Sequence, residues 1–280
     1  MNAPHIASGK QDTYNTAEAR PEAGVKSVHI AFDVLEAVAN SPRDVGVTEL
    51  TELLGSTKAT IFRHLQTLVA RGYISQNLHS ARYRLGVKAQ LLGRLYEERF
   101  DLLTGAEPII RSLRDTLKQT IALGVVSPRG VTIMETMLSQ NTLEIGVRRG
   151  SEMAFHSTAQ GKVALAFSRQ PLMDTVKQQY QTRYTEHTIC DLREIELQTR
   201  LARERGWATA SQEMVLGINA IAVPILNDTG DCIATLAVVG SMQFVRPVPS
   251  AEQVKALQQA ANLISANLGY RGEPILDAQA

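Results

Sequence analysis

The stretch VTELTELLGSTKATIFRHLQTL, residues 47–68, decides how the N-terminal part of this chain folds. A good N-cap residue, Thr48, precedes a short apolar pattern, which predicts a helix that begins there and ends at Gly55. Glycine also permits the tight turn that follows. The side chains that this helix is expected to bury are Leu50, Leu53 and Leu54.

A second helix follows the turn, with Ser56 as its expected cap and an end near Ala70. Ile61, Leu65 and Leu68 recur at i, i+4 and i+7, so they are expected to face inward. Another helix is predicted upstream over Val28–Ala39. Two short strand patterns downstream, at 73–76 and 82–85, enclose the polar tip 77–81 and predict a hairpin wing.

Positive charge is concentrated in this same region. Between Leu53 and Tyr96 there are seven Lys and Arg and no Asp or Glu, although the whole chain has a net charge of only +1. A block of one sign in a nearly neutral protein is typical of a surface that binds a polyanion. The basic residues are Lys58, Arg63, Arg71, Arg82, Arg84, Lys88 and Arg94.

A helix after a short turn, with a basic and hydroxylic outer face, is the arrangement that enters a DNA major groove. Arg63 on that face is expected to contact a guanine edge, and Arg82 and Arg84 on the wing to contact phosphate or the minor groove. The alternative is a helical bundle whose charged face only meets solvent. The predicted DNA-binding residues are Ser56, Thr57, Lys58, Thr60, Arg63, His64, Arg82 and Arg84.

An amphipathic helix is predicted from Val87 and treated as a linker over residues 87–106, ending before Pro108. Another helix, Ile109 to about Lys118, is expected to follow. Leu91 and Leu95 belong either to an ordinary core or to a contact with a second copy of the chain. The sequence pattern leaves both possibilities open.

From Thr120 the pattern changes to short strands mixed with helices, which predicts an α+β domain with a largely antiparallel sheet. The expected strands are Ile121–Val126, Val131–Leu138, Leu143–Val147, Trp207–Ser211, Ile218–Leu226 and Cys232–Val239. The expected helices are Ala159–Phe167, Leu192–Arg205 and Ser250–Leu268.

Several motifs together resemble the IclR-type bacterial transcription regulators over about residues 26–270. In the N-terminal part they are residues 47–68 with RGYI (71–74) and YRLG (83–86); in the C-terminal part they are FHSTAQGK (155–162), RGW (205–207), Glu213 and GINAIAVP (217–224). The resemblance implies a winged helix-turn-helix (25–86), the linker helix (87–106) and a GAF-like effector-binding domain (107–270). The polar composition of residues 1–24 predicts a disordered tail, and 271–280 is expected to be a second tail. The resemblance also implies binding to double-stranded operator DNA as a dimer or a dimer of dimers.

The resemblance places a small organic-acid effector between the sheet and the loop-helix that begins near residue 156. Backbone amides at a helix start can hold a carboxylate. The facing strands are mostly apolar, which favours an aromatic or medium-sized acid over a very small polar one. The predicted effector-binding residues are Ser157, Thr158, Ala159, Gly161, Asn219, Ala220, Ala237 and Val239. Strand alternation means that either Ala220 and Ala222 or Asn219 and Ile221 face the ligand.

Other classes of function find less support. No phosphate-binding loop or GxGxxG motif occurs, and His187 with Cys190 lacks a second ligand pair, so we expect no cofactor and no metal. His156 beside Ser157 lacks a third residue to orient it. An enzyme acting on a small carboxylate, with a fused winged-helix interaction module, is the alternative function. No apolar segment resembles a signal or a membrane span, so a cytoplasmic protein without a membrane partner is expected.

Overall fold

The computed structural model describes residues 25–97, 102–142, 144–179 and 181–275. The chain divides into two compact units, residues 1–96 and 97–280, and the division falls inside the expected linker helix. The predicted tail 1–24 and the last five residues of the predicted tail 271–280 lie outside the described ranges. Within those ranges, no helix combines the length and the apolarity that crossing a bilayer requires.

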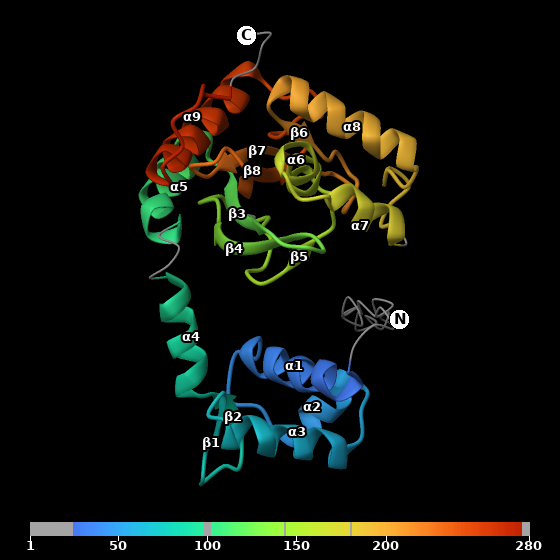
Figure 1. Ribbon diagram of the computed structural model, residues 1–280, viewed down its shortest axis with the longest axis vertical. Helices are drawn as coiled ribbons and strands as arrows, with labels where there is room; N and C mark the ends of the chain where they lie inside the picture. The colour runs from blue at the N-terminus through green and yellow to red at the C-terminus, as the bar shows by residue number, and fades with distance from the viewer. Residues whose placement is uncertain (1–24, 98–101, 143, 180, 276–280) are drawn as a thin grey trace, which may run out of the picture. The chain divides into compact units, whose positions relative to one another are not determined.

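The first unit is a winged helix-turn-helix (Figure 1). It contains the helices α1 (Lys26–Ala39), α2 (Val47–Leu54), α3 (Lys58–Ala70) and α4 (Val87–Glu97), and the strands β1 (Ile74–Gln76) and β2 (Tyr83–Leu85). Gly55 supplies the turn between α2 and α3 in a left-handed conformation, φ 56°, which glycine adopts at little cost. Leu50, Ile61 and Leu65 are fully buried in one core, as expected.

Three local expectations in this unit are wrong. The N-cap of α2 is Gly46, whose amide donates to the Glu49 carboxylate at 2.8 Å, and Thr48 lies inside the helix. Thr57, not Ser56, caps α3, because its hydroxyl accepts from the Thr60 amide. Leu53 is 67% exposed, because α2 turns only one side toward the core of this small unit.

Helix α5 (Leu102–Leu117) includes Pro108, so the expected helix boundary before this proline is also wrong. Proline removes one helical hydrogen bond. A buried stripe of Leu102, Ala106, Ile110 and Leu113 spans the proline and packs α5 against the sheet on both sides of it. That packing explains why the helix continues. Residues 98–101, between α4 and α5, are not described.

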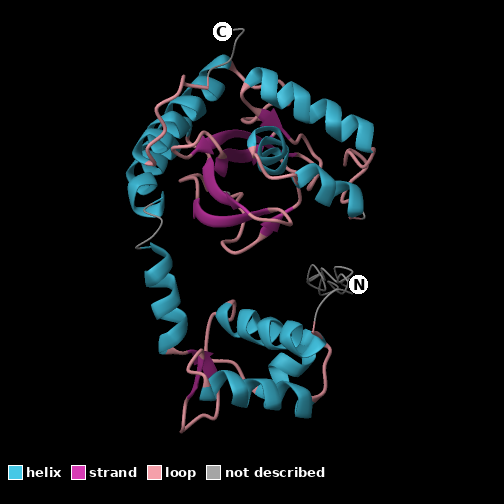
Figure 2. Cartoon of the chain, in the orientation of Figure 1, coloured by secondary structure: helices cyan, strands magenta, loops and turns pink. Residues whose placement is uncertain are grey.

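The second unit is built on a six-stranded antiparallel sheet in the order β5-β4-β3-β8-β7-β6 (Figure 2). Its strands are β3 (Thr120–Val126), β4 (Val131–Met137), β5 (Glu152–Met153), β6 (Ala208–Thr209), β7 (Ile218–Leu226) and β8 (Cys232–Ser241). The expected strand 143–147 does not form over residues 144–147, and residue 143 is not described. The edge position beside β4 is instead taken by β5.

Helices cover both faces of this sheet (Figure 1). They are α5 and α9 (Ala251–Asn267) on one face, and α6 (Ala159–Phe167), α7 (Leu172–Gln178) and α8 (Leu192–Arg205) on the other side. Ile221, Val223 and Leu236 share a core with residues of α5 and α9. Helix α7 was not expected from the sequence.

Beneath α6 the sheet presents a row of alanines. Ala122 pairs with Ala237, Ala237 with Ala222, and Ala222 with Ala208, so the row crosses β3, β8, β7 and β6. The residues Ala159, Val163 and Ala166 of α6 belong to the same core cluster as Ala208, Ala222 and Ala237. Because these side chains are small, the helix packs closely on the sheet. We call this set of four the alanine row.

Candidate DNA interface and effector site

The exposed side of α3 carries the candidate DNA-reading residues. Ile61, Leu65 and Leu68 are buried, which turns Arg63 to the opposite side, where it is exposed. Thr57 and Lys58 at the start of α3 are exposed, while Ser56 and Thr60 are half-buried. The hydroxyls of Thr57 and Thr60 lie 2.9 Å apart and hold the start of the helix. The Lys58 cation therefore lies at the N-terminus of α3, a position that suits phosphate.

His64 does not belong to this surface. Its side chain is only 8% exposed, so the expectation that it faces outward is wrong. The reason is its spacing, because His64 lies three residues after Ile61 and four before Leu68, on the buried stripe. Phe62, which sequence reasoning passed over, is 49% exposed beside Arg63. The sequence signal was an aromatic residue at a position off the buried stripe of Ile61, Leu65 and Leu68.

The two wing arginines differ in their surroundings. Arg82 donates to the Asp44 carbonyl at 2.7 Å and forms an ion pair with Glu49 at 2.6 Å, which ties the root of the wing to the start of α2. The Gly46 amide and Arg82 together lower the pKa of the Glu49 carboxyl. Arg84 is exposed, and its only described contact is a 3.4 Å bond to Ser75. Arg84 is thus the wing arginine that remains available to DNA.

The predicted effector segment forms the start of α6. Thr158 caps the helix, accepting from the Gly161 amide at 2.9 Å and donating to the Ala154 carbonyl at 2.7 Å. Its hydroxyl and the Gly161 amide are therefore used within the protein. A Cβ on Gly161 would lie 2.4 Å from the Ala154 oxygen, so glycine is needed here for close packing. The Ala159 and Gln160 amides, at the first two helical positions, have no partner within the helix.

The strand residues separate into two faces. Ile221 and Val223 face α5 and α9, and Asn219 shares their side by alternation, with its amide donating to the Arg246 carbonyl at 2.7 Å. The expectation that Asn219 lines the effector site is therefore wrong. Ala220 and Ala222 face α6, together with Ala237 and Val239.

On the α6 side, two of the expected wall residues are used for packing. Ala237 belongs to the alanine row under α6, and Ala159 packs in the same cluster. The next row of the sheet consists of Thr120, Val239 and Ala220, which are direct neighbours across β3, β8 and β7. We call these three residues the outer row. Thr120 and Val239 lie outside the cluster that contains the α6 residues, whereas Ala220 packs against that cluster.

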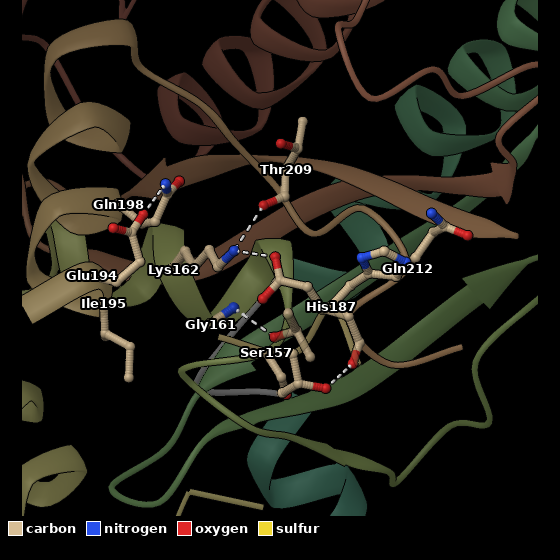
Figure 3. Close-up of polar contacts among 12 residues, drawn as sticks. Ser157, Gly161, Lys162, His187, Glu194, Ile195, Gln198, Thr209 and Gln212 are labelled. Atoms are coloured by element: carbon tan, nitrogen blue, oxygen red, sulfur yellow. Dashed lines mark hydrogen bonds and ion pairs between the residues drawn. The ribbon is translucent and has the colours of Figure 1, made fainter. Parts of the chain in front are cut away.

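A buried ion pair, absent from the sequence predictions, anchors α6 to the loop between β6 and β7 (Figure 3). The side chains of Lys162 and Glu213 are 2% and 6% exposed. The Lys162 ammonium donates to Glu213 Oε1 and, at 3.2 Å, to the Thr209 carbonyl. Burial lowers the pKa of Lys162 and raises that of Glu213, whereas each charge shifts the other in the opposite direction.

Further hydrogen bonds hold the loop that carries Glu213. The Thr188 hydroxyl donates to the Glu213 carbonyl at 2.7 Å, and the Thr185 hydroxyl donates to the Gln212 carbonyl at 2.6 Å. Ser157 donates to the Met214 sulfur at 3.2 Å. The segment 182–191, the loop 210–217 and the start of α6 therefore form one network, so movement of one part will strain the others.

His156 and Ser157 do not form a catalytic pair in this arrangement. His156 Nε2 lies 2.9 Å from the Thr182 carbonyl, whereas the Ser157 hydroxyl forms a hydrogen bond to the Met214 sulfur. Burial lowers the pKa of His156. His187 Nε2 lies 3.9 Å from the Glu186 carboxylate, and the Cys190 thiol donates a hydrogen bond to the Thr188 carbonyl. Cys232 is buried, and burial raises the pKa of its thiol to about 12, so the thiol stays protonated.

Two surface cavities occur elsewhere in the second unit. One, of about 440 Å³, lies between α5, β4 and the 138–149 segment; the other, of about 160 Å³, adjoins α5 and Glu135. The larger is lined by Arg111, Arg114 and Arg149. These three are paired with Glu107, Asp115 and Glu135 at 2.6–2.7 Å. None of the predicted effector residues lines either cavity.

Comparison with known protein families agrees with both units. Residues 27–78 match the IclR helix-turn-helix domain, and residues 95–266 match the bacterial transcriptional regulator IclR C-terminal domain. The chain belongs to the IclR family of transcriptional regulators. It is thus a ligand-responsive, DNA-binding regulator by family, with the winged helix-turn-helix and the effector domain that the sequence motifs indicated.

Individual IclR-family proteins show the extent of this similarity. The regulator KdgR of Dickeya chrysanthemi is 32% identical over 251 residues, covering 89% of this chain and 82% of KdgR. XynR of Escherichia coli is 28% identical, covering 88% of this chain and 98% of XynR. The crystal structure of an IclR regulator from Silicibacter has a TM-score of 0.74 at 24% identity, covering 90% of this chain and 100% of the other.

Proposed function

We propose that this IclR-family chain binds an operator as a homodimer through α3 and the wing, and that a small organic acid in the second unit controls the binding. The observation that carries the proposal is the position of Arg63. It is exposed on α3, opposite the buried stripe, in a region without acidic residues from Leu53 to Tyr96. Operator binding also implies the cytoplasm as the place of action.

Replacing Arg63 with Ala is expected to weaken operator binding by about 1–3 kcal/mol and to relax preference at one base pair, because a bidentate contact to guanine is lost. The measurement is fluorescence anisotropy with an operator selected from random sequence. Arg193→Ala is the matched control, because Arg193 is exposed on α8 in the other unit. Unchanged operator affinity in Arg63→Ala would contradict the proposed docking of α3.

A dimer is supported by apolar side chains that the first unit leaves exposed. Val25, Val28 and Phe32 recur at i, i+3 and i+7 along α1 and are 49–65% exposed. Helix α4 exposes its own set, Val87, Leu91, Leu92 and Leu95. A single winged helix offers little contact area, and specific binding gains from two symmetric half-sites. We therefore propose that α1 and α4 contact a second copy.

The effector that we propose is an aromatic or medium-sized acid. The amides at the start of α6 that lack a helical partner suit a carboxylate, and the outer row of Thr120, Val239 and Ala220 carries mainly apolar side chains. An IclR homologue from Microbacterium hydrocarbonoxydans, 20% identical with a TM-score of 0.70 and covering 86% of this chain and 98% of its own, was crystallised with 4-hydroxybenzoate. This fold therefore accepts a ring with a carboxylate.

Benzoate-like acids are expected to bind more tightly than pyruvate or glyoxylate in isothermal calorimetry. Val239→Ser is expected to weaken benzoate binding by about tenfold, because it removes apolar contact of roughly two methyl groups. Val215→Ser, at an exposed valine in the 210–217 loop, is the control. Tighter binding of the two- or three-carbon acids would contradict an apolar site. Product formation during these titrations would instead favour the enzyme alternative.

A further inference from the structure

Leu78 has a higher exposed fraction, 94%, than any other large hydrophobic side chain in the described part of the chain. It lies at the tip of the wing, between β1 and β2, where the hairpin protrudes from the three helices (Figure 1). Leaving a leucine in water forgoes the stabilisation that its burial would bring. Its place at a protruding tip leaves the side chain accessible to a bound partner.

The tip presents Leu78 in a defined position. Asn77 Oδ1 accepts from the amides of His79 and Ser80 at 3.0 and 3.2 Å. The Ala81 amide donates to the Asn77 carbonyl at 2.8 Å, and Ala81 has φ 55°, a conformation that closes the loop. The wing root is tied down by Arg82, which binds Glu49 and the Asp44 carbonyl. Leu78 therefore projects from a hydrogen-bonded turn on an anchored base.

Charge around the tip identifies the class of occupant. The wing itself contains no acidic residue, and Arg84 is exposed on β2, the strand that follows the tip. At the root, Glu49 is paired with Arg82, and Asp44 gives its backbone carbonyl to the same arginine. An apolar tip on a wing with an exposed arginine, in the unit that carries Arg63, fits a polyanion with an apolar interior. Duplex DNA has both properties, in its phosphates and its stacked bases.

We propose that Leu78 inserts into the minor groove of the operator as an apolar wedge, partly unstacking one base step and bending the duplex. Side chains of this type act in the same way in other minor-groove proteins. Flexible pyrimidine–purine steps unstack most readily, so this contact adds a preference for such a step without any hydrogen bond to a base. The inference rests on the operator binding proposed above and adds a second, shape-dependent reader to it.

The experiment compares the full-length wild type with Leu78→Ala and Leu78→Phe on one operator fragment. End-labelled DNA reports the bend by energy transfer, and anisotropy reports the affinity. Leu78→Ala is expected to lose most of the bend and about tenfold in affinity, from lost apolar burial. Its salt dependence should match the wild type, because no phosphate contact is removed. Leu78→Phe should keep the bend. Leu263→Ala, an exposed leucine of α9, is the control.

Two results would overturn the wedge while leaving operator binding intact: a wild-type complex without a bend, or a Leu78→Ala complex that bends as the wild type does. A change of oligomeric state in Leu78→Ala without DNA would assign the tip to a contact between copies and would also overturn it. Failure of the wild type to select any operator would instead contradict the proposed function itself. The Arg63→Ala variant, tested on the same operator, separates failure of the wedge from failure of operator binding by α3.

Discussion

Replacing Lys162 with Met is expected to lower the free energy of unfolding by about 3–5 kcal/mol, because the buried Glu213 carboxylate then has no opposite charge. The loss should be measured by urea unfolding. Lys177→Met is the matched control. Its ion pair with Glu196 is 3.0 Å long but nearly half exposed, so the expected loss is below about 1 kcal/mol.

The pH dependence of this variant tests the same cause. Burial raises the pKa of Glu213, and without Lys162 only the backbone hydrogen bond from Ile189 still lowers it. In the folded variant, Glu213 therefore keeps its proton to a higher pH than in the unfolded chain, where its pKa is near 4.5. The destabilisation should be small below that pKa and should grow as the pH rises through the folded-state pKa. A loss independent of pH would contradict an unpaired carboxylate as its cause.

A double variant separates the charge from the packing. Lys162→Met with Glu213→Leu replaces both partners by apolar side chains, and such replacements are often neutral or stabilising. Most of the stability lost in Lys162→Met is therefore expected to return. If the double variant is as unstable as the single one, the hydrogen bond from Lys162 to the Thr209 carbonyl, not the ion pair, is what matters.

The second large effect is expected from Leu91→Glu on α4, where Leu91 is 51% exposed. A charge on the proposed contact between copies should give a monomer, and loss of the second half-site should weaken operator binding by about 10²–10⁴-fold. Sedimentation and anisotropy are the measurements. Gln90→Glu adds the same charge on another side of α4 and is the control. A dimeric Leu91→Glu with normal binding would rule out α4 as the contact.

Regular periodicity predicted much of the fold. The α6 and α8 bounds and those of β7 agree with the structure residue for residue, since each segment lies between clear turn or cap signals. The segment 144–147 has a similar apolar pattern but does not join the sheet, and β5 occupies the edge beside β4. Local sequence does not decide which segment takes an edge strand.

Within the candidate sites, the errors have specific physical causes. The burial of His64 follows from its helical spacing, which the sequence already contained. The choice between Asn219 and Ala220 needed one fact from the fold, the face of β7 that packs on α9. The Lys162–Glu213 pair joins residues 51 positions apart, and only the tertiary arrangement brings them together. No local pattern marks either residue as buried.

The alanine row limits how this regulator can diverge. Ala237, Ala222 and Ala208 pack in one cluster with α6, so a larger side chain at any of them would lift the helix that Lys162 anchors. Thr120 and Val239 of the outer row lie outside that cluster. Relatives that acquire new effectors are therefore expected to vary in side-chain size along the outer row. The strand positions under α6 are expected to keep alanine.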